Sequence, residues 1–220
     1  MPAMKKTMRP VEAVALIPDG ASVMIGGFMG VGSPKRLIAA LAQAGRRGLT
    51  LIANDTALPD KGIGKLISAG CFDRIVVSHI GLNPETQALM TAGLLTVELL
   101  PQGTLVECIR AAGVGLGGVL TESGLGTLVE EGKQKVTVNG REYLLEPPIH
   151  ADFALIAARQ SDYVGNLEYA LTAQNFNPIM ALAGEVVIAE PEHIVPVGMI
   201  PPDSVRTPGI LVDHLIERAL

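Results

Sequence analysis

The sequence predicts an α/β protein with an open, mostly parallel β-sheet, helices on both faces of that sheet, and an added β-hairpin. Short runs rich in β-branched and other apolar residues alternate with segments of helical periodicity. These runs are apolar almost throughout, which is typical of strands that helices bury on both faces. No internal repeat or long linker divides the 220 residues, so we expect a single domain spanning residues 1–220.

The first half of the chain carries this alternation most clearly. Residues 1–20 are interpreted as a first amphipathic helix and not as a signal peptide, because Glu12 interrupts the apolar run and no small-residue cleavage site follows. Pro34 and Gly45 bracket one of the later helices, where proline suits the first turn and glycine the C-cap. Strands are expected at 21–27, 49–55, 74–80 and 95–100, and helices at 34–45, 64–70, 84–93 and 102–113.

The second half is less regular. Residues 113–132 contain seven glycines and predict a long irregular segment of the kind that is usually functional or touches a partner. Residues 135–145 predict a hairpin, because Asn139-Gly140 suits a two-residue type I′ turn. Further strands are expected at 153–159, 165–171 and 185–190, and helices at 177–184 and 208–220.

Composition and charge exclude several classes of protein. The net charge is −5, lysines and arginines are scattered singly, and aromatic residues make up 3%, so nucleic-acid binding is not expected. No apolar run approaches the ~18 residues of a membrane span. Charged residues make up only 18%, against about 25% in an average soluble domain. This low fraction predicts that part of the surface is buried in an oligomer.

Cysteines and histidines give no sign of a metal centre. Cys71 and Cys108 lie far apart in apolar surroundings and are interpreted as reduced, buried thiols of a cytoplasmic protein. The four histidines show no metal-ligand spacing, so no metal site is expected. His79 lies at the end of a predicted strand and is interpreted first as a structural histidine, with a place facing a site at the carboxyl edge of the sheet as the alternative. Four polar residues near element ends are candidates to line a cleft: Asn54, Asp55, Gln102 and Asn177.

Four glycines fall within the stretch Gly26–Gly32, directly before a predicted helix. The spacing of a P-loop is present, but Ser33-Pro34 stands where Lys-Ser/Thr is required. A dinucleotide fingerprint begins at Gly30-Val31-Gly32, but Lys35 replaces its third glycine. Asp55 closes the next predicted strand, where a ribose-binding acid would lie, so a nicotinamide-binding oxidoreductase remains an alternative.

Local chemistry nevertheless favours an anionic ligand at this stretch. Glycines let backbone N–H groups approach an anion without interference from a Cβ atom. The following helix is expected to present unpaired N–H groups and a partial positive charge at its N-terminus. Lys35 and Arg36 add positive charge at the same turn. The prediction is therefore a site for an anionic acyl or phosphate group.

The stretch from Asp19 to Pro34, DGASVMIGGFMGVGSP, resembles the signature of the alpha subunits of family I coenzyme A transferases. An Asp-Gly start, three apolar residues, Gly-Gly-Phe, and a later Gly and Pro all stand at the signature's fixed positions. The resemblance continues through SHIGLNPET, PQGTLVE, GLGTLVEEGK and GNLEYALTAQNFNP. The pattern is most similar to family members that act on acetoacetate and acetate.

The resemblance implies a coenzyme-A-transferase-like fold and a ping-pong transfer of coenzyme A between short-chain carboxylic acids. In the family, a glutamate on the beta subunit attacks the acyl-CoA and forms a glutamyl-CoA thioester. No catalytic residue is therefore expected in this chain, and the expected partner is a beta subunit in an α₂β₂ assembly. Coenzyme A is a substrate and no permanently bound cofactor is expected. The expected coenzyme-A-binding residues are Gly26, Gly27, Phe28, Met29, Gly30, Val31 and Gly32.

Glu122 is the residue of this chain that most invites a different assignment of the nucleophile. It precedes Ser-Gly in the glycine-rich segment and invites interpretation as the nucleophile. However, residues 121–127 resemble the alpha-subunit pattern, in which Glu122 replaces a proline, and they lack the Ser-Glu-Asn-Gly type of motif of the beta subunit. Glu122 is therefore interpreted as a solvated or interface residue. A non-catalytic binding or scaffold subunit remains a further alternative.

Overall fold

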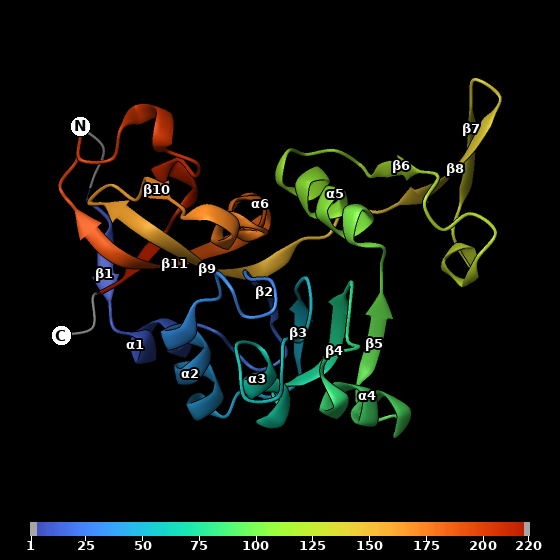
Figure 1. Cartoon of the computed structure of the whole chain (residues 1–220), viewed down its shortest axis with the longest axis horizontal. Helices are drawn as coiled ribbons and strands as arrows, with labels where there is room; N and C mark the ends of the chain where they lie inside the picture. The colour runs from blue at the N-terminus through green and yellow to red at the C-terminus, as the bar shows by residue number, and fades with distance from the viewer. Residues whose placement is uncertain (1–3, 218–220) are drawn as a thin grey trace.

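The computed structural model describes residues 4–217, and its centre is one large sheet (Figure 1). Its strands are β1 (Lys6–Met8), β2 (Ser22–Ile25), β3 (Leu49–Ile52), β4 (Phe72–Val77), β5 (Thr96–Leu99), β9 (Ala151–Asp162), β10 (Leu167–Glu168), β11 (Gly184–Val195) and β12 (His214–Ile216). They lie in the order β1-β12-β11-β9-β2-β3-β4-β5, with β10 paired to β9. Every ladder is parallel except β10–β9, which confirms the open, mostly parallel sheet.

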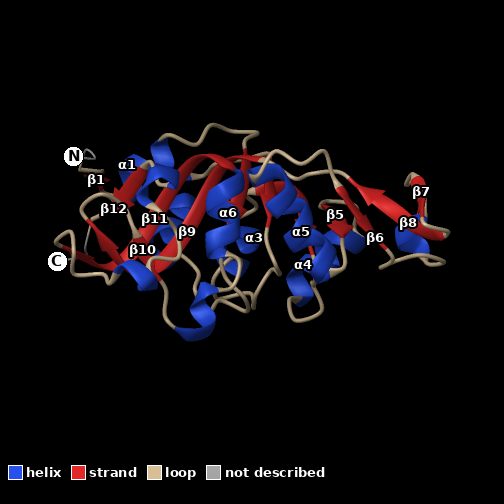
Figure 2. Cartoon of the chain, turned by 90° about the horizontal axis from the view of Figure 1, so that it is seen from above, coloured by secondary structure: helices blue, strands red, loops and turns tan. Residues whose placement is uncertain are grey.

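Helices cover both faces of this sheet, as the apolar strands predict (Figures 1 and 2). One face carries α1 (Pro10–Ala15), α2 (Lys35–Ala44), α3 (Gly64–Ser68) and α4 (Pro84–Thr91), and the other carries α5 (Gln102–Gly113) and α6 (Asn177–Ala183). Leu37 and Leu41 of α2 belong to the first core, and Ile109 and Met180 belong to the second. All four of these side chains are essentially buried.

A separate three-stranded antiparallel sheet projects from the end of the molecule that carries β5 (Figure 1). It contains β6 (Val119–Thr121), β7 (Lys135–Val138) and β8 (Arg141–Glu146). The β7–β8 turn has φ angles of 50° at Asn139 and 77° at Gly140, which confirms the predicted type I′ hairpin. The expectation that 113–132 is irregular throughout was wrong, because β6 and a 3₁₀ turn (Leu128–Glu130) form within it.

Three predicted elements differ from the structure. The helix expected at 208–220 is a 3₁₀ turn (Gly209–Leu211) followed by β12, and residues 218–220 lie outside the described residues. The segment forms a strand because β1 and β11 both pair with it in parallel. The expected helix at 1–20 is likewise reduced to α1, since β1 pairs with β12. Residues 165–171 form a strand only at β10.

The structure also bears on the predictions for the cysteines and for membrane-spanning helices. Cys71 and Cys108 are free and buried, and burial raises the pKa of the Cys108 thiol to about 11. Within residues 4–217, no helix combines the length and apolar character needed to cross a bilayer. The expectation of one domain over residues 1–220 stays a prediction.

Gly113 tests how closely α5 and α6 pack. A methyl group at Gly113 would overlap Leu182, whereas one at Gly103, in the first turn of the same helix, would meet no atom within 4 Å. We predict that Gly113→Ala lowers the free energy of unfolding by about 1–3 kcal/mol through overpacking. Gly103→Ala, the matched control, is expected to be neutral or stabilising by up to ~1 kcal/mol. Chemical denaturation of both variants measures the difference, and equal stabilities would contradict the close packing.

Candidate functional site

The loop Gly26–Gly32 emerges from the carboxyl end of β2 as a tight hairpin. Phe28 and Val31 exchange two backbone hydrogen bonds, of 3.0 and 2.9 Å. Between them, Met29 has a φ of 52° and Gly30 a φ of 82°. Two successive positive φ angles define a type I′ turn, which glycine adopts without strain. The loop therefore presents Phe28, Met29 and Val31 to solvent, where they are 45%, 37% and 50% exposed.

Two asparagines hold the loop from one side. The Gly27 N–H donates to Asn175 Oδ1 at 3.1 Å, and Asn175 Nδ2 donates to the Val31 carbonyl at 3.0 Å. Asn177, fully buried, donates from Nδ2 to the Gly32 carbonyl at 3.0 Å. A Cβ atom at Gly26 would overlap the Asn177 side chain, so glycine is required there. These contacts fix the loop on the segment that begins α6.

Asp55 holds the loop from the opposite side. Its carboxylate, in a residue only 5% exposed, accepts hydrogen bonds from the Met29 N–H at 2.9 Å and from the Ala57 N–H at 2.7 Å. It also accepts one from Asn54 Nδ2 at 2.6 Å. A carboxylate committed to three donors is not free to bind a ribose. This geometry disfavours the nicotinamide-binding alternative.

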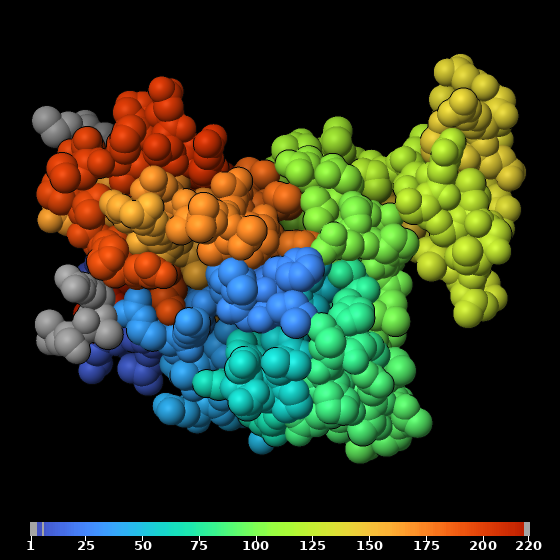
Figure 3. Space-filling model, in the orientation of Figure 1, coloured from blue at the N-terminus to red at the C-terminus, as the bar shows by residue number. Residues whose placement is uncertain are grey.

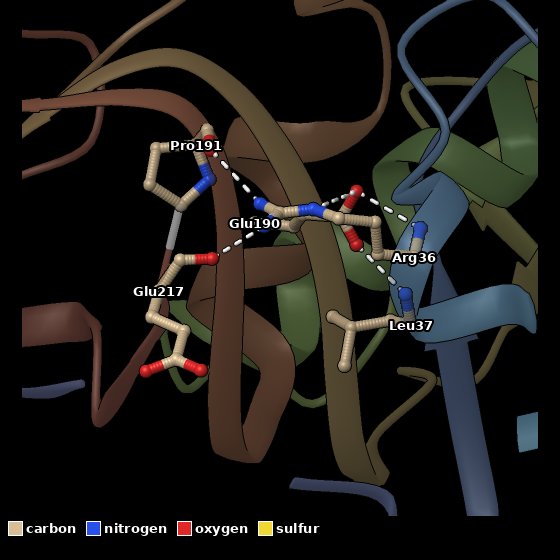
Figure 4. Close-up of polar contacts among 5 residues, drawn as sticks. All are labelled: Arg36, Leu37, Glu190, Pro191 and Glu217. Atoms are coloured by element: carbon tan, nitrogen blue, oxygen red, sulfur yellow. Dashed lines mark hydrogen bonds and ion pairs between the residues drawn. The ribbon is translucent and has the colours of Figure 1, made fainter. Parts of the chain in front are cut away.

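The N-terminus of α2 does not match its predicted role. The Glu190 carboxylate accepts hydrogen bonds from the backbone N–H groups of Arg36, at 3.0 Å, and Leu37, at 2.7 Å (Figure 4). Glu190 lies on β11 and is 8% exposed. The expectation that this helix offers these unpaired N–H groups to a ligand was therefore wrong, because the chain supplies its own anion from a distant strand.

The Arg36 side chain binds Glu190 and two backbone carbonyl groups beside it (Figure 4). Its Nε lies 3.4 Å from Glu190 Oε1, and its terminal nitrogens donate to the carbonyls of Pro191, at 3.2 Å, and of Glu217. The carboxylate is thus neutralised locally, as a buried charge must be. The start of α2 is consequently tied to β11 and to the chain that follows β12.

The loop separates two pockets at the carboxyl edge of the sheet, the edge where open α/β folds bind ligands. Figure 3 shows the blue segment that contains it at the surface, between the orange and the teal parts of the chain. The larger pocket has a volume of about 580 Å³ and lies against Gly30–Ser33, α2, β9 and β11. Its charged or titratable lining residues are Lys35, Arg36, Arg159, Tyr169, Glu190, Glu192 and His193.

The smaller pocket, of about 220 Å³, lies against Phe28 and Met29 on the other side of the loop. Asn54 and Asp55 line it after β3, His79 after β4, and Gln102 at the start of α5. Gln102 Nε2 donates to Asn54 Oδ1 at 2.7 Å. The structure thus brings three of the four polar candidates together and adds His79. The fourth, Asn177, lies beneath the loop and lines neither pocket.

Glu122 lines neither of these pockets. It is exposed directly after β6, and it forms an ion pair with Arg141 at 3.8 Å. Among residues 4–217, no group of histidine, cysteine or acidic side chains is arranged to hold a metal ion. Asn175 and Glu190 were not predicted as site residues from the sequence, although Asn175 belongs to the quoted segment GNLEYALTAQNFNP.

Comparison with known sequences identifies close relatives. The family model described as "Coenzyme A transferase" matches residues 7–218. The chain is 52% identical over 211 residues to "Acetate CoA-transferase subunit alpha" of Escherichia coli strain K12, covering 96% of both chains. It is 49% identical over 212 residues to "Acetoacetyl-CoA:acetate/butyrate CoA transferase alpha subunit" of Clostridium acetobutylicum, covering 96% of this chain and 97% of the relative.

Solved structures share the fold. An acyl-CoA transferase of E. coli O157:H7, YdiF, in a thioester complex with CoA, aligns with a TM-score of 0.87 and 26% identity over 97% of this chain. This chain spans only 47% of that chain, or about half of its length. A variant of the decarboxylase AibA/AibB aligns with a TM-score of 0.81 and 30% identity, covering 98% of this chain and 84% of that chain. A fold shared with a decarboxylase does not by itself define the reaction.

Glu190 gives a direct test of how the loop and α2 are anchored. We predict that Glu190→Gln lowers the free energy of unfolding by about 1–3 kcal/mol, because the amide cannot accept both backbone N–H bonds or balance Arg36. The matched control is Glu192→Gln, an exposed acid two residues along the same strand, expected to change stability by less than ~0.5 kcal/mol. Denaturant titration of both variants provides the comparison. Equal losses would show that Glu190 does not anchor α2.

Proposed function

The chain belongs to the coenzyme A transferase family, and we propose that it is the alpha subunit of an enzyme that moves coenzyme A between short-chain acids. The donor is acetoacetyl-CoA or another short acyl-CoA, and the acceptor is acetate. The observation that carries this proposal is the 52% identity, over 96% of both chains, to a relative named as the alpha subunit of an acetate CoA-transferase. The 49% identity to an acetoacetyl-CoA:acetate/butyrate transferase subunit supports the same substrate class.

The reaction proceeds by ping-pong chemistry through a glutamyl-CoA thioester on the beta subunit. Covalent exchange needs a free carboxylate beside the thioester. Two of the three carboxylates that line the pockets are already committed, Asp55 to the loop and Glu190 to α2, and the third, Glu192, is exposed on β11. Glu122 lines neither pocket. This supports a division of labour in which the present chain binds substrate and the partner attacks it.

The Gly26–Gly32 loop is the element that borders coenzyme A in this proposal. It lies between the two pockets, so a ligand that reaches both of them passes Phe28–Val31. The smaller pocket suits the short acyl group, because its volume of about 220 Å³ is below that of pockets for drug-sized ligands. Polar amides of Asn54 and Gln102 at this pocket suit hydrogen bonding to a carboxylate or a thioester carbonyl.

A beta subunit completes the enzyme, and we propose an α₂β₂ heterotetramer. The alignment with YdiF covers 97% of this chain but only 47% of the YdiF chain, so that transferase chain is about twice as long. Relatives of matching length are named as alpha subunits. Coenzyme A enters as a substrate, without a permanently bound cofactor. We place the enzyme in the cytoplasm, in keeping with two free, buried thiols.

Reconstitution tests the proposal. We predict that this chain mixed with its beta subunit transfers coenzyme A from acetoacetyl-CoA to acetate, and that neither chain does so alone. Steady-state assays of acetyl-CoA formation on the two chains and on the mixture supply the measurement. Activity of the isolated alpha chain would refute the division of labour. An inactive mixture that binds acyl-CoA would instead favour the non-catalytic binding subunit.

Glu122→Gln provides a second, independent test. We predict that the assembled variant retains turnover within a few-fold of the wild type, because Glu122 faces solvent and pairs weakly with Arg141. Measuring kcat of the mixture is sufficient. A loss of ~10⁴ or more, the scale expected when a nucleophile is removed, would assign the covalent step to this chain.

A further inference from the structure

The small sheet formed by β6, β7 and β8 has one polar face and one apolar face. Side chains alternate between the two faces along each strand, and residues paired across an antiparallel ladder lie on the same face. Leu144 pairs with Thr121 on one side and with Lys135 on the other. The polar face therefore carries, besides Leu144, mainly charged and hydroxyl side chains: Thr121, Lys135, Thr137, Glu142 and Glu146. The apolar face carries five apolar side chains: Leu120, Val136, Val138, Tyr143 and Leu145.

The glycine-rich segment 122–133 packs on the polar face. Leu144 is fully buried there, and a Cβ atom added at Gly124 of the segment would contact both Leu144 and Val129. Lys133 forms an ion pair of 2.6 Å with Glu146, which is only 2% exposed. The chain thus covers the polar face of the small sheet with its own residues.

The apolar face of the small sheet is open to solvent. Leu120 is 43% and Val138 is 39% exposed, and the other three apolar side chains of this face are half-buried. An antiparallel sheet ordinarily turns its apolar face to the core and its polar face to water. Within residues 4–217 this sheet does the reverse. Contiguous apolar side chains left at the surface mark a site of association, so another chain is expected to cover this face.

The position of the small sheet separates this surface from the two pockets. No residue of β6, β7 or β8 lines either pocket. Figure 3 shows the yellow part of the chain standing out from the main body, away from the blue segment that contains the Gly26–Gly32 loop. In the proposed function, the subunit that supplies the nucleophile has to reach the pockets. The apolar face therefore offers a separate contact, of the kind that an α₂β₂ assembly needs between its two αβ halves.

The charges on the apolar face favour a second copy of this chain as the occupant. Arg141 lies on this face, and Glu122 follows Leu120 by two residues and is 3.8 Å from Arg141. The two side chains are 75% and 57% exposed, so each is accessible to an opposite charge. A twofold axis brings a patch against itself, and the patch must then contain its own complement. One cation and one anion beside five apolar side chains meet that requirement without any net charge.

The size of the face sets how strong this contact is. A standard interface contains about 20–30 residues on each side, and the apolar face of the small sheet provides far fewer. Two isolated copies of the chain are therefore held only weakly by this face. Two αβ pairs that meet there are joined by a contact that is lost more easily than the contact between α and β.

We propose that the apolar face of the small sheet is the contact between two copies of this chain, which joins two αβ pairs about a twofold axis. Leu120, Val136 and Val138 of one copy pack against the same face of the other, and Arg141 of each copy meets Glu122 of the other. The inference rests on the α₂β₂ assembly of the proposed function. Its consequence is that loss of this contact leaves αβ pairs with both pockets intact.

A pair of substitutions on neighbouring residues of β7 tests this contact. Val136→Lys places a charge on the apolar face, and the matched control Thr137→Lys places the same charge at an exposed position of the polar face. Each variant is mixed with the beta subunit, and sedimentation velocity is measured over a concentration series. We expect Val136→Lys to raise the dissociation constant of α₂β₂ into αβ pairs roughly 100-fold, because a tenfold loss occurs at each of two symmetric sites. Thr137→Lys should sediment as the wild type, and both variants should keep kcat within a few-fold.

Chemical cross-linking identifies the occupant of the face directly. Val138→Cys in the assembled enzyme is treated with a short bismaleimide, which should link two copies of this chain to each other. Leu94→Cys, an exposed position outside the small sheet, is the control and should give no such product. A product that joins Val138→Cys to the beta subunit, or the absence of any linked product, would overturn the proposal.

The remaining outcomes separate this inference from the proposed function. If the wild type sediments as αβ, or if Val136→Lys sediments as the wild type, the contact between copies is wrong while the transferase activity stands. Dissociation of Val136→Lys into free α and β chains would assign the face to the beta subunit and overturn the proposal as well. Should Val136→Lys not fold, Leu120→Lys, on a different strand of the same face, is measured in the same way. If the wild-type mixture transfers no coenzyme A, the proposed function itself fails.

Discussion

The hydrogen bonds that satisfy the backbone of the Gly26–Gly32 loop are the constraint on which both pockets depend. Asp55 binds the loop from the end of β3, and Asn175 and Asn177 bind it from the start of α6. These three side chains bind the backbone of the same hairpin from two opposite sides. Glu190 fixes the helix that follows in the same manner, from β11. These hydrogen bonds fix the loop between the two pockets, so its position determines the shape of each pocket.

This anchoring engages two of the three carboxylates that line the pockets, Asp55 and Glu190. A glycine-rich turn before a helix commonly binds phosphate through the helix N-terminus. Here an internal carboxylate takes that place, and a second carboxylate is consumed by the loop. The groups that remain free at the pockets are chiefly amides, histidines, two unpaired cations and the exposed carboxylate of Glu192. We propose that these groups bind and orient an acyl-CoA and that the partner subunit supplies the nucleophile.

The sequence predicted most of the main sheet and its helices, because apolar runs and helical periodicity are local signals. The predictions of secondary structure were wrong where strand pairing between distant segments overrides these local signals. Residues 214–216 form a strand only because β1 and β11 flank them, and no local pattern contains that information. The irregular segment likewise gains β6 from its pairing with β8.

The residues of the candidate site were likewise predictable from the sequence only in part. The glycines, Asn54, Asp55 and Gln102 were recognisable, since they follow predicted strands or open a predicted helix. Glu190 was not recognisable, because it lies on a strand and reaches a helix 154 residues earlier in the chain. Its role emerges only when β11 is placed beside α2. The resemblance to a family predicted that the loop is functional, and the geometry adds that it separates two different pockets.

The central claim is that this chain holds the acyl-CoA while the partner forms the covalent bond to coenzyme A. Intact-mass spectrometry of the assembled enzyme after incubation with acetoacetyl-CoA tests it most directly. The account predicts that the beta subunit gains the mass of bound coenzyme A as a thioester and that the 23.0 kDa chain keeps its original mass. A coenzyme A adduct on this chain, at Glu122 or at any other carboxylate, would contradict it.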